Sequence, residues 1–303
     1  MRNQMTTIAL KTYSRTYDQP IITIAPDLSR VSELKNNNRE EALTFLAIRP
    51  VHTVVMASFI NDNGIESDLN RGKFHGYRNA QGILEGIALI GHTTLVEART
   101  ENALKALAFA ARSSETPIHL IMSDGTAAET FWKYYTDGVR KPRLTCTEKL
   151  FEISFPFMVR DCKHEIRLAQ ADELLQIAEA QAEIAFMECG VDPMQKDRDG
   201  FLKRVARRVE QGRVFVVFEN GKLIFKADII AETSDVIYLE GIYVASEYRG
   251  QGVGSSCLAK LSLDLLGRVE NICFLSNVEF TNAHQSYYTA GYKNTDSCIT
   301  LFV

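Results

Sequence analysis

Three glycines fall within five positions, at Gly250, Gly252 and Gly254, in the stretch "YVASEYRGQGVGSSCLAKL" that runs from Tyr243 to Leu261. They stand between an apolar, strand-like run and an amphipathic helical pattern. Glycine at this density allows unusual backbone conformations and lets another group approach the backbone closely. The stretch therefore predicts a strand, a tight loop and a helix whose first N–H groups are accessible to a ligand.

Two common nucleotide-binding loops do not fit this stretch. The P-loop requires a lysine directly after its last glycine, and none stands there. The dinucleotide-binding fingerprint G-x-G-x-x-G fits Gly250 and Gly252 but meets Ser255 in place of its third glycine. Only about 50 residues follow the loop, too few for the rest of a dinucleotide-binding domain. The glycines therefore predict neither of these two loops.

The region around the glycines follows a regular order of elements. From His164 onward the patterns predict a strand, two helices, three strands, a helix, a strand, a helix and a final strand. The first two of the three central strands are joined by Asn220-Gly221, a pair typical of tight hairpins. The order predicts an α/β fold of the α+β type with a mixed sheet.

The N-terminal half repeats the later part of this order more faintly. Its amphipathic helix begins at Thr100, but the position of the glycine loop holds only "VEARTEN". We therefore predict two tandem copies of one fold, of which the first is degenerate. The expected divisions are an N-terminal extension over residues 1–40, the degenerate domain over 41–160 and the functional domain over 161–303.

Composition excludes several classes of function. The net charge of −4 argues against bulk attraction to nucleic acid or to an anionic membrane. No run approaches the roughly 20 apolar residues that span a bilayer, and no long apolar core of a secretion signal is present. The six cysteines and six histidines are scattered without metal-site spacing. We therefore expect a cytoplasmic protein with reduced thiols, no metal, and neither nucleic acid nor membrane as partner.

Arg249, Gly252 and Gly254 form the pattern R-x-x-G-x-G. Together with the order of elements, this pattern resembles the R/Q-x-x-G-x-G/A signature of the GCN5-related N-acetyltransferase (GNAT) superfamily, over nearly half the chain. The resemblance implies acetyl-coenzyme A (acetyl-CoA) as cosubstrate. A helix N-terminus suits its pyrophosphate, and Arg249 either contacts a phosphate or braces the loop. The implied cofactor-binding residues of the loop are Arg249, Gly250, Gln251, Gly252, Val253, Gly254 and Ser255.

The strand before the loop has a role implied by the same resemblance. Its backbone would bind the pantetheine arm of coenzyme A at Ile242, Tyr243 and Val244. Gly241, isolated within this strand, is typical of a bulge or of a close backbone approach. The alternative is a glycine that only relieves crowding.

Two residues are candidates for the chemistry. The segment "AHQSYYTAGY" resembles the family's A-x-x-x-Y-x-x-x-G-F segment, which implies that Tyr287 lies near the sulfur of coenzyme A and protonates the leaving thiolate. The alternative for Tyr287 is aromatic core packing. Glu240 stands where many relatives carry a glutamate that acts as a base through water. The alternative for Glu240 is a solvated or structurally paired carboxylate.

The predicted function is acetyl-CoA-dependent N-acetylation of a primary amine, small molecule or peptide, by direct attack on the thioester. Glu188 and Asp192, between the first two helices of the C-terminal half, are acids suited to a cationic amine. The N-terminal half is expected either to close over the acceptor or to mediate homodimer formation. The alternative function is a regulatory module that binds coenzyme A or acyl-CoA without catalysis.

Overall fold

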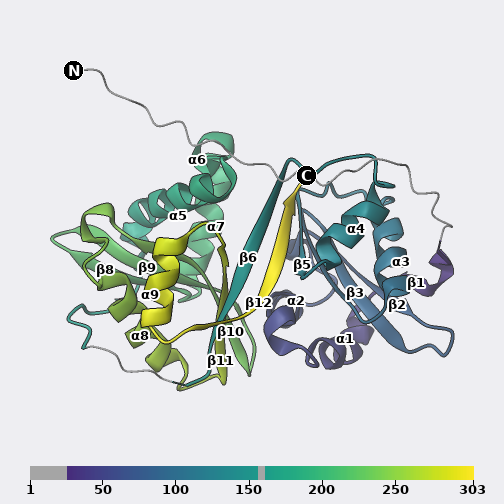
Figure 1. Cartoon of the computed structure of the whole chain (residues 1–303), viewed down its shortest axis with the longest axis horizontal. Helices are drawn as coiled ribbons and strands as arrows, with labels where there is room; N and C mark the ends of the chain where they lie inside the picture. Colours follow the sequence, from purple (N-terminus) through teal and green to yellow (C-terminus); the bar gives the residue numbers. More distant parts are fainter. Residues whose placement is uncertain (1–25, 156–160) are drawn as a thin grey trace.

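Twelve strands form a single sheet in this computed structural model, which describes residues 26–155 and 161–303 (Figure 1). The strand order is β1-β2-β3-β4-β5-β12-β6-β11-β10-β9-β8-β7. Among the described pairs, β4–β5 and β10–β11 are parallel and the others are antiparallel. The predicted α/β fold with a mixed sheet is confirmed.

The N-terminal half follows the full order strand, two helices, three strands, helix, strand, helix, strand. Its elements are β1 (Val31–Glu33), α1 (Arg39–Leu46), α2 (Pro50–Asn63), β2 (Gly72–Arg78), β3 (Leu84–Gly91), β4 (Thr93–Ala98), α3 (Glu101–Ala111), β5 (Leu120–Asp124), α4 (Ala127–Tyr135) and β6 (Leu144–Ile153).

Some of these elements were not expected from the sequence. β1 and the start of α1 lie within the segment predicted as an extension, and β1 pairs with β2. Helix α2 shows no single apolar stripe because it packs in two directions. Met56 and Ile60 face the N-terminal core, whereas Val54 packs against residues of β9, β10 and β11. The repeat in the chain is therefore more complete than the sequence pattern indicates.

The C-terminal half repeats the same order, with one short additional helix. Its elements are β7 (Arg167–Leu168), α5 (Leu174–Cys189), α6 (Pro193–Lys196), α7 (Arg198–Glu210), β8 (Val214–Glu219), β9 (Lys222–Glu232), β10 (Val236–Val244), α8 (Val253–Leu265), β11 (Asn271–Asn277), α9 (Thr281–Thr289) and β12 (Lys293–Phe302).

The hairpin predicted between the first two long strands of this half is present. β8 and β9 pair on either side of Asn220 and Gly221, whose φ angles are 50° and 73°. Positive φ at both turn residues is what a tight two-residue hairpin requires.

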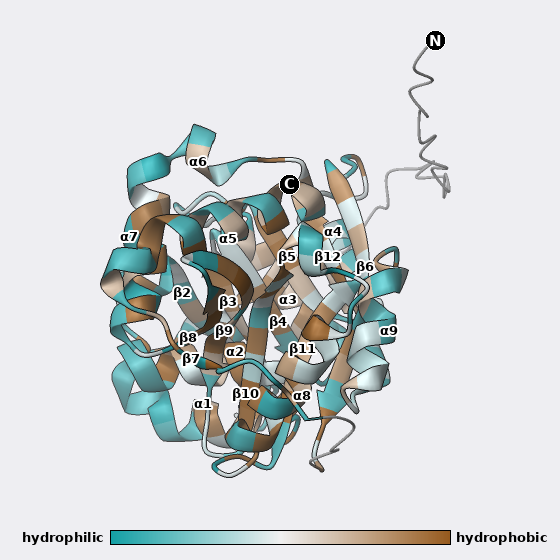
Figure 2. Ribbon diagram, turned by 90° about the vertical axis from the view of Figure 1, so that its left-hand side faces the viewer, coloured by the Kyte–Doolittle hydropathy of each residue, from teal (hydrophilic) through white to brown (hydrophobic). Residues whose placement is uncertain are grey.

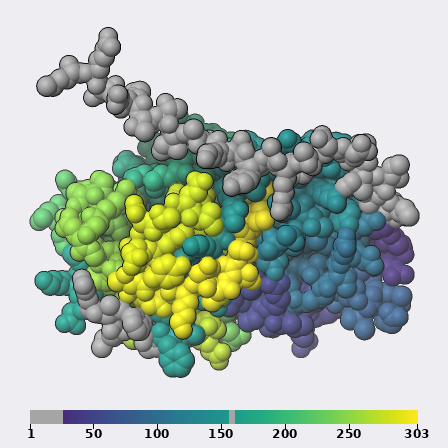
Figure 3. Space-filling view, viewed as in Figure 1, coloured from purple at the N-terminus to yellow at the C-terminus, as the bar shows by residue number. Residues whose placement is uncertain are grey.

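The last strand of each half lies in the sheet of the other half. β12 pairs with β5, β6 pairs with β11, and β6 and β12 pair with each other along most of their length. Figure 1 shows these two strands running side by side between the halves, and Figure 3 shows teal atoms of the β6 region among the yellow atoms of the C-terminal segment. Each of the two predicted domains is therefore completed by a strand from the other.

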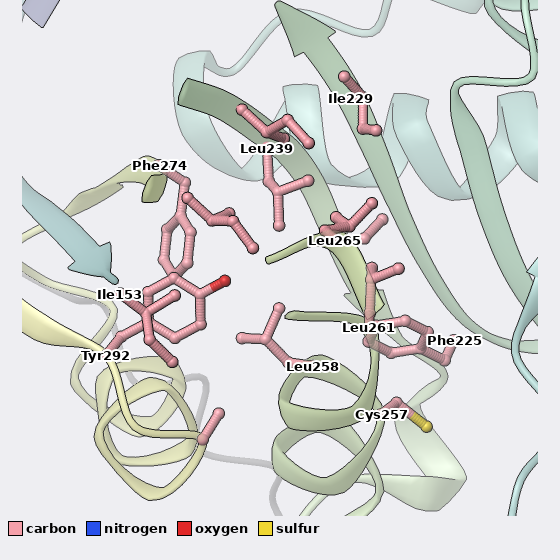
Figure 4. Packing of buried hydrophobic residues seen from close by; sticks show 14 of the residues in the cluster. Ile153, Phe225, Ile229, Leu239, Cys257, Leu258, Leu261, Leu265, Phe274 and Tyr292 are labelled. Carbon is pink, nitrogen blue, oxygen red and sulfur yellow. The ribbon is translucent and has the colours of Figure 1, made fainter. Parts of the chain in front are cut away.

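Helices cover both faces of the C-terminal sheet. On one face, Leu258, Leu261 and Leu265 of α8 pack toward Leu239, and Ile153 of β6 joins the same cluster (Figure 4). α5 and α7 cover the other face, and α2 adjoins them there. Hydrophobic residues lie mainly in the strands, and hydrophilic ones mainly on the outer helices (Figure 2). In the part of the chain that the structure describes, no helix has the length and hydropathy to cross a bilayer.

Candidate active site

Strands β10 and β11 run side by side only at their beginnings. Their parallel pairing extends from Val236–Asn271 to Tyr238–Cys273, although β10 continues to Val244. From Leu239 onward this edge of β10 has no strand partner. Backbone N–H and C=O groups on such an edge remain available to another extended molecule.

A β-bulge at Gly241 marks this separation. The register of β10 on β9 shifts between Glu240 and Tyr243, and Gly241 has a φ of +62°. A Cβ atom there would lie 2.3 Å from Gln181 Oε1 and 2.6 Å from Lys226 Nζ. The predicted bulge is confirmed, and the predicted crowding is present as well. Only glycine satisfies both the backbone conformation and the space.

Glycine is required at the three positions of the loop for two different structural reasons. Gly250 and Gly252 have φ angles of +74° and +82°, which side chains disfavour. Gly254 has an ordinary φ, but a Cβ there would lie 3.0 Å from Val244 Cγ2. Two glycines therefore shape the loop, and the third lets α8 approach β10. The sequence predicted one common reason, access for the phosphates.

The N-terminus of α8 is free of internal caps. Its first backbone hydrogen bond is donated by Ser256 to Gly252 O, at 3.1 Å, so the three preceding helical N–H groups have no partner within the helix. No acidic residue stands in the first turn. The side chains of Gln251 and Ser255 turn back to carbonyl groups of the loop, at 2.6 and 3.0 Å. This arrangement favours the binding of an anion at the N-terminus of α8.

Arg249 is bound to the protein on two sides. Its Nε donates to Val244 O at 2.8 Å, and its Nη2 donates to Glu183 Oε1 at 3.0 Å. These contacts favour the bracing role over direct phosphate contact. Ile242 packs partly against the α8 side of the core, and Tyr243 packs partly against the α5 side.

The corresponding helix of the N-terminal half is built differently. α3 is capped by Thr100, whose hydroxyl accepts a hydrogen bond from Ala103 N at 3.2 Å. Glu101 adds a negative charge in the first turn. A capped and acidic helix start disfavours a phosphate.

The strand separation of the N-terminal half is occupied by ion pairs. β4 and β5 pair only as far as Leu95 and Met122. Just beyond, Glu97, only 4% exposed, is contacted by Arg49 at 3.3 Å and by Arg99. Arg49 also pairs with Asp124 of β5. In the N-terminal half, charged side chains therefore occupy the position that corresponds to the unpaired backbone edge of β10 in the C-terminal half.

Tyr287 of α9 combines core packing with a polar contact. Its ring meets Phe274 and Phe151 edge-on, at centroid distances of 4.7 and 5.2 Å. Its hydroxyl hydrogen-bonds with Ser276. Burial raises the pKa of Tyr287 to about 12, and Glu188 adds to this shift. The phenol is therefore protonated at neutral pH and holds a proton that it can donate.

Glu240 lies on β10 opposite Asp228 of β9. Burial raises the pKa of Glu240, and Arg208 opposes this shift. Lys226 and Arg208 both pair with Asp228, at 2.8 and 3.0 Å. No hydrogen bond or ion pair to Glu240 is formed by the described residues. This geometry does not support the alternative of a structurally paired glutamate.

Of the two acids expected to bind the acceptor, only Glu188 interacts with Glu240. Glu188 stands one residue before the end of α5 and is exposed; partial burial of its carboxyl raises its pKa, and Glu240 and Glu148 add to this shift. Asp192 instead caps α6 by accepting a hydrogen bond from Met194 N at 2.8 Å. Glu148 of β6 was not predicted, because only the strand exchange brings it to this site.

The buried cysteines are not activated nucleophiles. All six are free thiols. Burial raises the pKa of Cys146 to about 11 and that of Cys298 to about 12, so both remain protonated at neutral pH. Across the described residues, no group of His, Cys, Asp and Glu has an arrangement that could hold a metal ion.

One family model matches the part of the chain that contains this site. The family model of the acetyltransferase (GNAT) domain matches residues 210–294, which contain the glycine loop, Glu240 and Tyr287. No curated protein matches the chain in sequence.

Solved structures resemble the chain over most of its length. A Drosophila protein covers 90% of this chain and 98% of its own, with 13% identity and a TM-score of 0.66. An acetyltransferase of the GNAT family from Colwellia psychrerythraea covers the same shares, with 11% identity and a TM-score of 0.56. A tandem GNAT protein from the clavulanic acid biosynthesis pathway does so with 12% identity and a TM-score of 0.54. Residues 210–294 therefore match the model of the acetyltransferase (GNAT) domain, and the chain as a whole has the fold of a tandem GNAT protein.

Proposed function

We propose that this protein is an acetyl-CoA-dependent N-acetyltransferase with one active site, in its C-terminal half. The observation that carries this proposal is the uncapped N-terminus of α8 beside the free edge of β10. The pyrophosphate of acetyl-CoA would accept hydrogen bonds from the N–H groups of residues 250–255, and its pantetheine arm would lie along residues 242–244. The capped α3 and the ion pairs around Glu97 support a non-binding role for the first copy.

The residues around the strand separation fit direct transfer. Acetyl-CoA supplies a thioester, and the amine nitrogen forms a bond to its carbonyl carbon as the C–S bond breaks. Tyr287 would donate its proton to the departing sulfur, since its phenol is protonated at neutral pH. Glu240 would accept the proton that the amine loses, directly or through water. The protonated thiols of Cys146 and Cys298 do not favour an acyl-enzyme.

The test is coenzyme A release from acetyl-CoA with a panel of primary amines, followed by mass spectrometry of the products. The proposal expects release that depends on the amine, and a product heavier by one acetyl group. Acetyl-CoA binding without transfer to any amine would instead favour the regulatory module.

A further inference from the structure

A buried lysine lies against the bulge of β10. Lys226 of β9 is fully buried, and its Nζ donates to Gly241 O at 3.1 Å and to Gln181 Oε1 of α5 at 2.7 Å. The same Nζ lies 2.8 Å from Asp228 Oδ1, and Arg208 of α7 donates to the other oxygen of Asp228 at 3.0 Å. This network therefore connects the bulge to β9 and to both helices that cover this face of the sheet.

The bulge needs a donor from outside the strand ladder. Between its pairings with Asp228 and Lys226, β10 has two residues where β9 has one. A bulge of this kind leaves a residue outside the regular ladder. A buried carbonyl group without a donor costs free energy, and a charged donor forms a stronger hydrogen bond than a neutral one. The bond from Lys226 to Gly241 O therefore stabilises the bulged form of β10 over a regular strand.

The separation of β10 from β11 does not arise because β11 ends. β11 continues to Asn277, yet its pairing with β10 stops at Cys273. On its other side, β11 pairs with β6 as far as Asn277. A β10 without the bulge would have strand beside it to pair with, and that pairing would occupy backbone groups proposed to bind the pantetheine arm. The bulge therefore keeps this edge of β10 open.

Stability alone does not explain a charged network at this position. Removing charged groups from water is unfavourable, and well-packed apolar side chains often stabilise a core equally well. The face covered by α5 and α7 already has an apolar core, in which Ile177, Val205 and Val216 are fully buried. An apolar side chain at position 226 could extend that core, but it could not supply a donor to Gly241 O.

We infer that Lys226 is a positioning residue of the acetyl-CoA site. This inference rests on the proposed function. The ammonium group holds Gly241 O and thereby keeps the edge of residues 242–244 free for the pantetheine arm. Gln181 and Asp228 hold the ammonium group in place, and Arg208 fixes Asp228 from α7. Lys226 acts through the backbone of β10 and not by contact with the cofactor.

The site for the pyrophosphate depends on other contacts. Gly250 and Gly252 shape the loop through their positive φ angles, and Arg249 connects it to Glu183. Among the described residues, Lys226 makes no hydrogen bond or ion pair to this loop. Loss of the ammonium group should therefore weaken binding of the pantetheine arm and leave binding of the pyrophosphate intact.

The test uses acetyl-CoA and 3′-phosphoadenosine 5′-diphosphate, the part of coenzyme A that lacks the pantetheine arm. Calorimetric titration measures the dissociation constant of each ligand for the wild type and for Lys226→Met. This variant removes the donor, and Asp228 keeps its ion pair with Arg208. Acetyl-CoA should bind about tenfold more weakly, as loss of backbone hydrogen bonds to the arm predicts. The fragment should change by about twofold or less, because the start of α8 is unaltered.

Ile177→Ala is the matched control. Ile177 is fully buried, one turn before Gln181 on α5, and its truncation destabilises the same face without removing a donor to Gly241 O. It is expected to leave both dissociation constants unchanged. An equal loss of affinity for both ligands in Lys226→Met would overturn the inference, because that result indicates a general structural role. Unchanged affinity for acetyl-CoA in Lys226→Met would overturn it as well.

Gln181→Leu provides the test if Lys226→Met does not fold. It removes one hydrogen bond of the ammonium group and leaves the ion pair with Asp228 in place. Acetyl-CoA should then bind about threefold more weakly, with the fragment unaffected, because Nζ is held less firmly against Gly241 O. Wild-type affinity for acetyl-CoA in this variant would reject the positioning role.

These measurements separate the inference from the proposed function, since they require no acceptor. If the wild type binds neither ligand, the proposed function fails. If the wild type binds both ligands and the variants bind acetyl-CoA equally well, only the further inference fails.

Discussion

At the scale of single residues, the geometry of the site depends on the close packing of Gln181 and Lys226 around Gly241. The bulge turns β10 directly after Glu240, the proposed base, and Lys226 and Gln181 fill the space that a side chain would need. Lys226 is fully buried, and Asp228, Gln181 and Gly241 O take up its charge and its hydrogen bonds. A change of one methyl group at Gly241 therefore disturbs a buried charge network.

Gly241→Ala should lower the free energy of unfolding by about 3 kcal/mol or more, through left-handed strain together with displacement of the buried Lys226. Chemical denaturation measures the loss. Gly82→Ala is the matched control, because Gly82 has a φ of +79° and nothing within 4 Å of its added Cβ. That variant should lose only the strain, roughly 1–2 kcal/mol. Equal losses in both variants would contradict the account of Gly241.

Tyr287→Phe should reduce kcat by about a hundredfold or more, because it removes the proton donor to the thiolate. The dissociation constant of acetyl-CoA should stay nearly the same, since the ring remains packed on Phe274 and Phe151. With a pKa of about 12, the phenol of the wild type loses its proton only far above neutral pH, so activity should not fall on that account near neutrality. Turnover close to that of the wild type would remove Tyr287 from the chemistry.

At the scale of elements, the two copies differ most at one helix N-terminus. α8 has Gly252 at its N-cap position, with no capping side chain and no acid in its first turn. α3 is capped by the side chain of Thr100 and carries Glu101 in its first turn. The same architecture therefore offers an anion site in one copy and a self-satisfied helix start in the other.

Glu183→Ala should weaken acetyl-CoA binding by about two- to fivefold, if Arg249 acts by bracing the loop through an exposed ion pair. Calorimetric titration of acetyl-CoA provides the measurement. Tighter binding in this variant would indicate that Glu183 competes with a phosphate for Arg249, and would contradict the bracing role.

Local signals in the sequence were sufficient for the elements of the C-terminal half. Asn220-Gly221 predicts its hairpin, the glycine loop predicts the start of α8, and Gly241 predicts the bulge. Signals that depend on distant parts of the chain were not available. The two-sided burial of α2 removes its apolar stripe, and Glu148 reaches the site only through the strand exchange. Glu240, Tyr287 and Glu188 were candidates from the sequence, but Glu148 was not.

At the scale of the whole molecule, the strand exchange makes the halves interdependent. β6 fills the position between β11 and β12, and Phe151 and Ile153 belong to the C-terminal core. Without β6, the C-terminal half loses the antiparallel partner of β11 and part of the packing around Tyr287. The N-terminal half is then a structural part of the proposed active site, although the start of its own α3 is capped and acidic.

Residues 161–303 produced alone should fail to show a cooperative unfolding transition, because the edge of β11 and the ring of Phe274 lose their partners. Produced together with residues 1–160, they should copurify and bind acetyl-CoA. Circular dichroism and calorimetry measure both outcomes. A stable C-terminal half that binds acetyl-CoA with full affinity would show that β6 is dispensable.

The most direct test of a single acetyl-CoA site at the start of α8 is calorimetric titration of the wild type and of Gly252→Glu. Gly82→Glu serves as the control, since its glycine has a similar φ of +79° far from the loop. The wild type and the control should each bind one acetyl-CoA per chain, and Gly252→Glu should bind none, because its carboxylate repels the pyrophosphate at the helix N-terminus. Two molecules per chain, or unchanged binding by Gly252→Glu, would contradict the account.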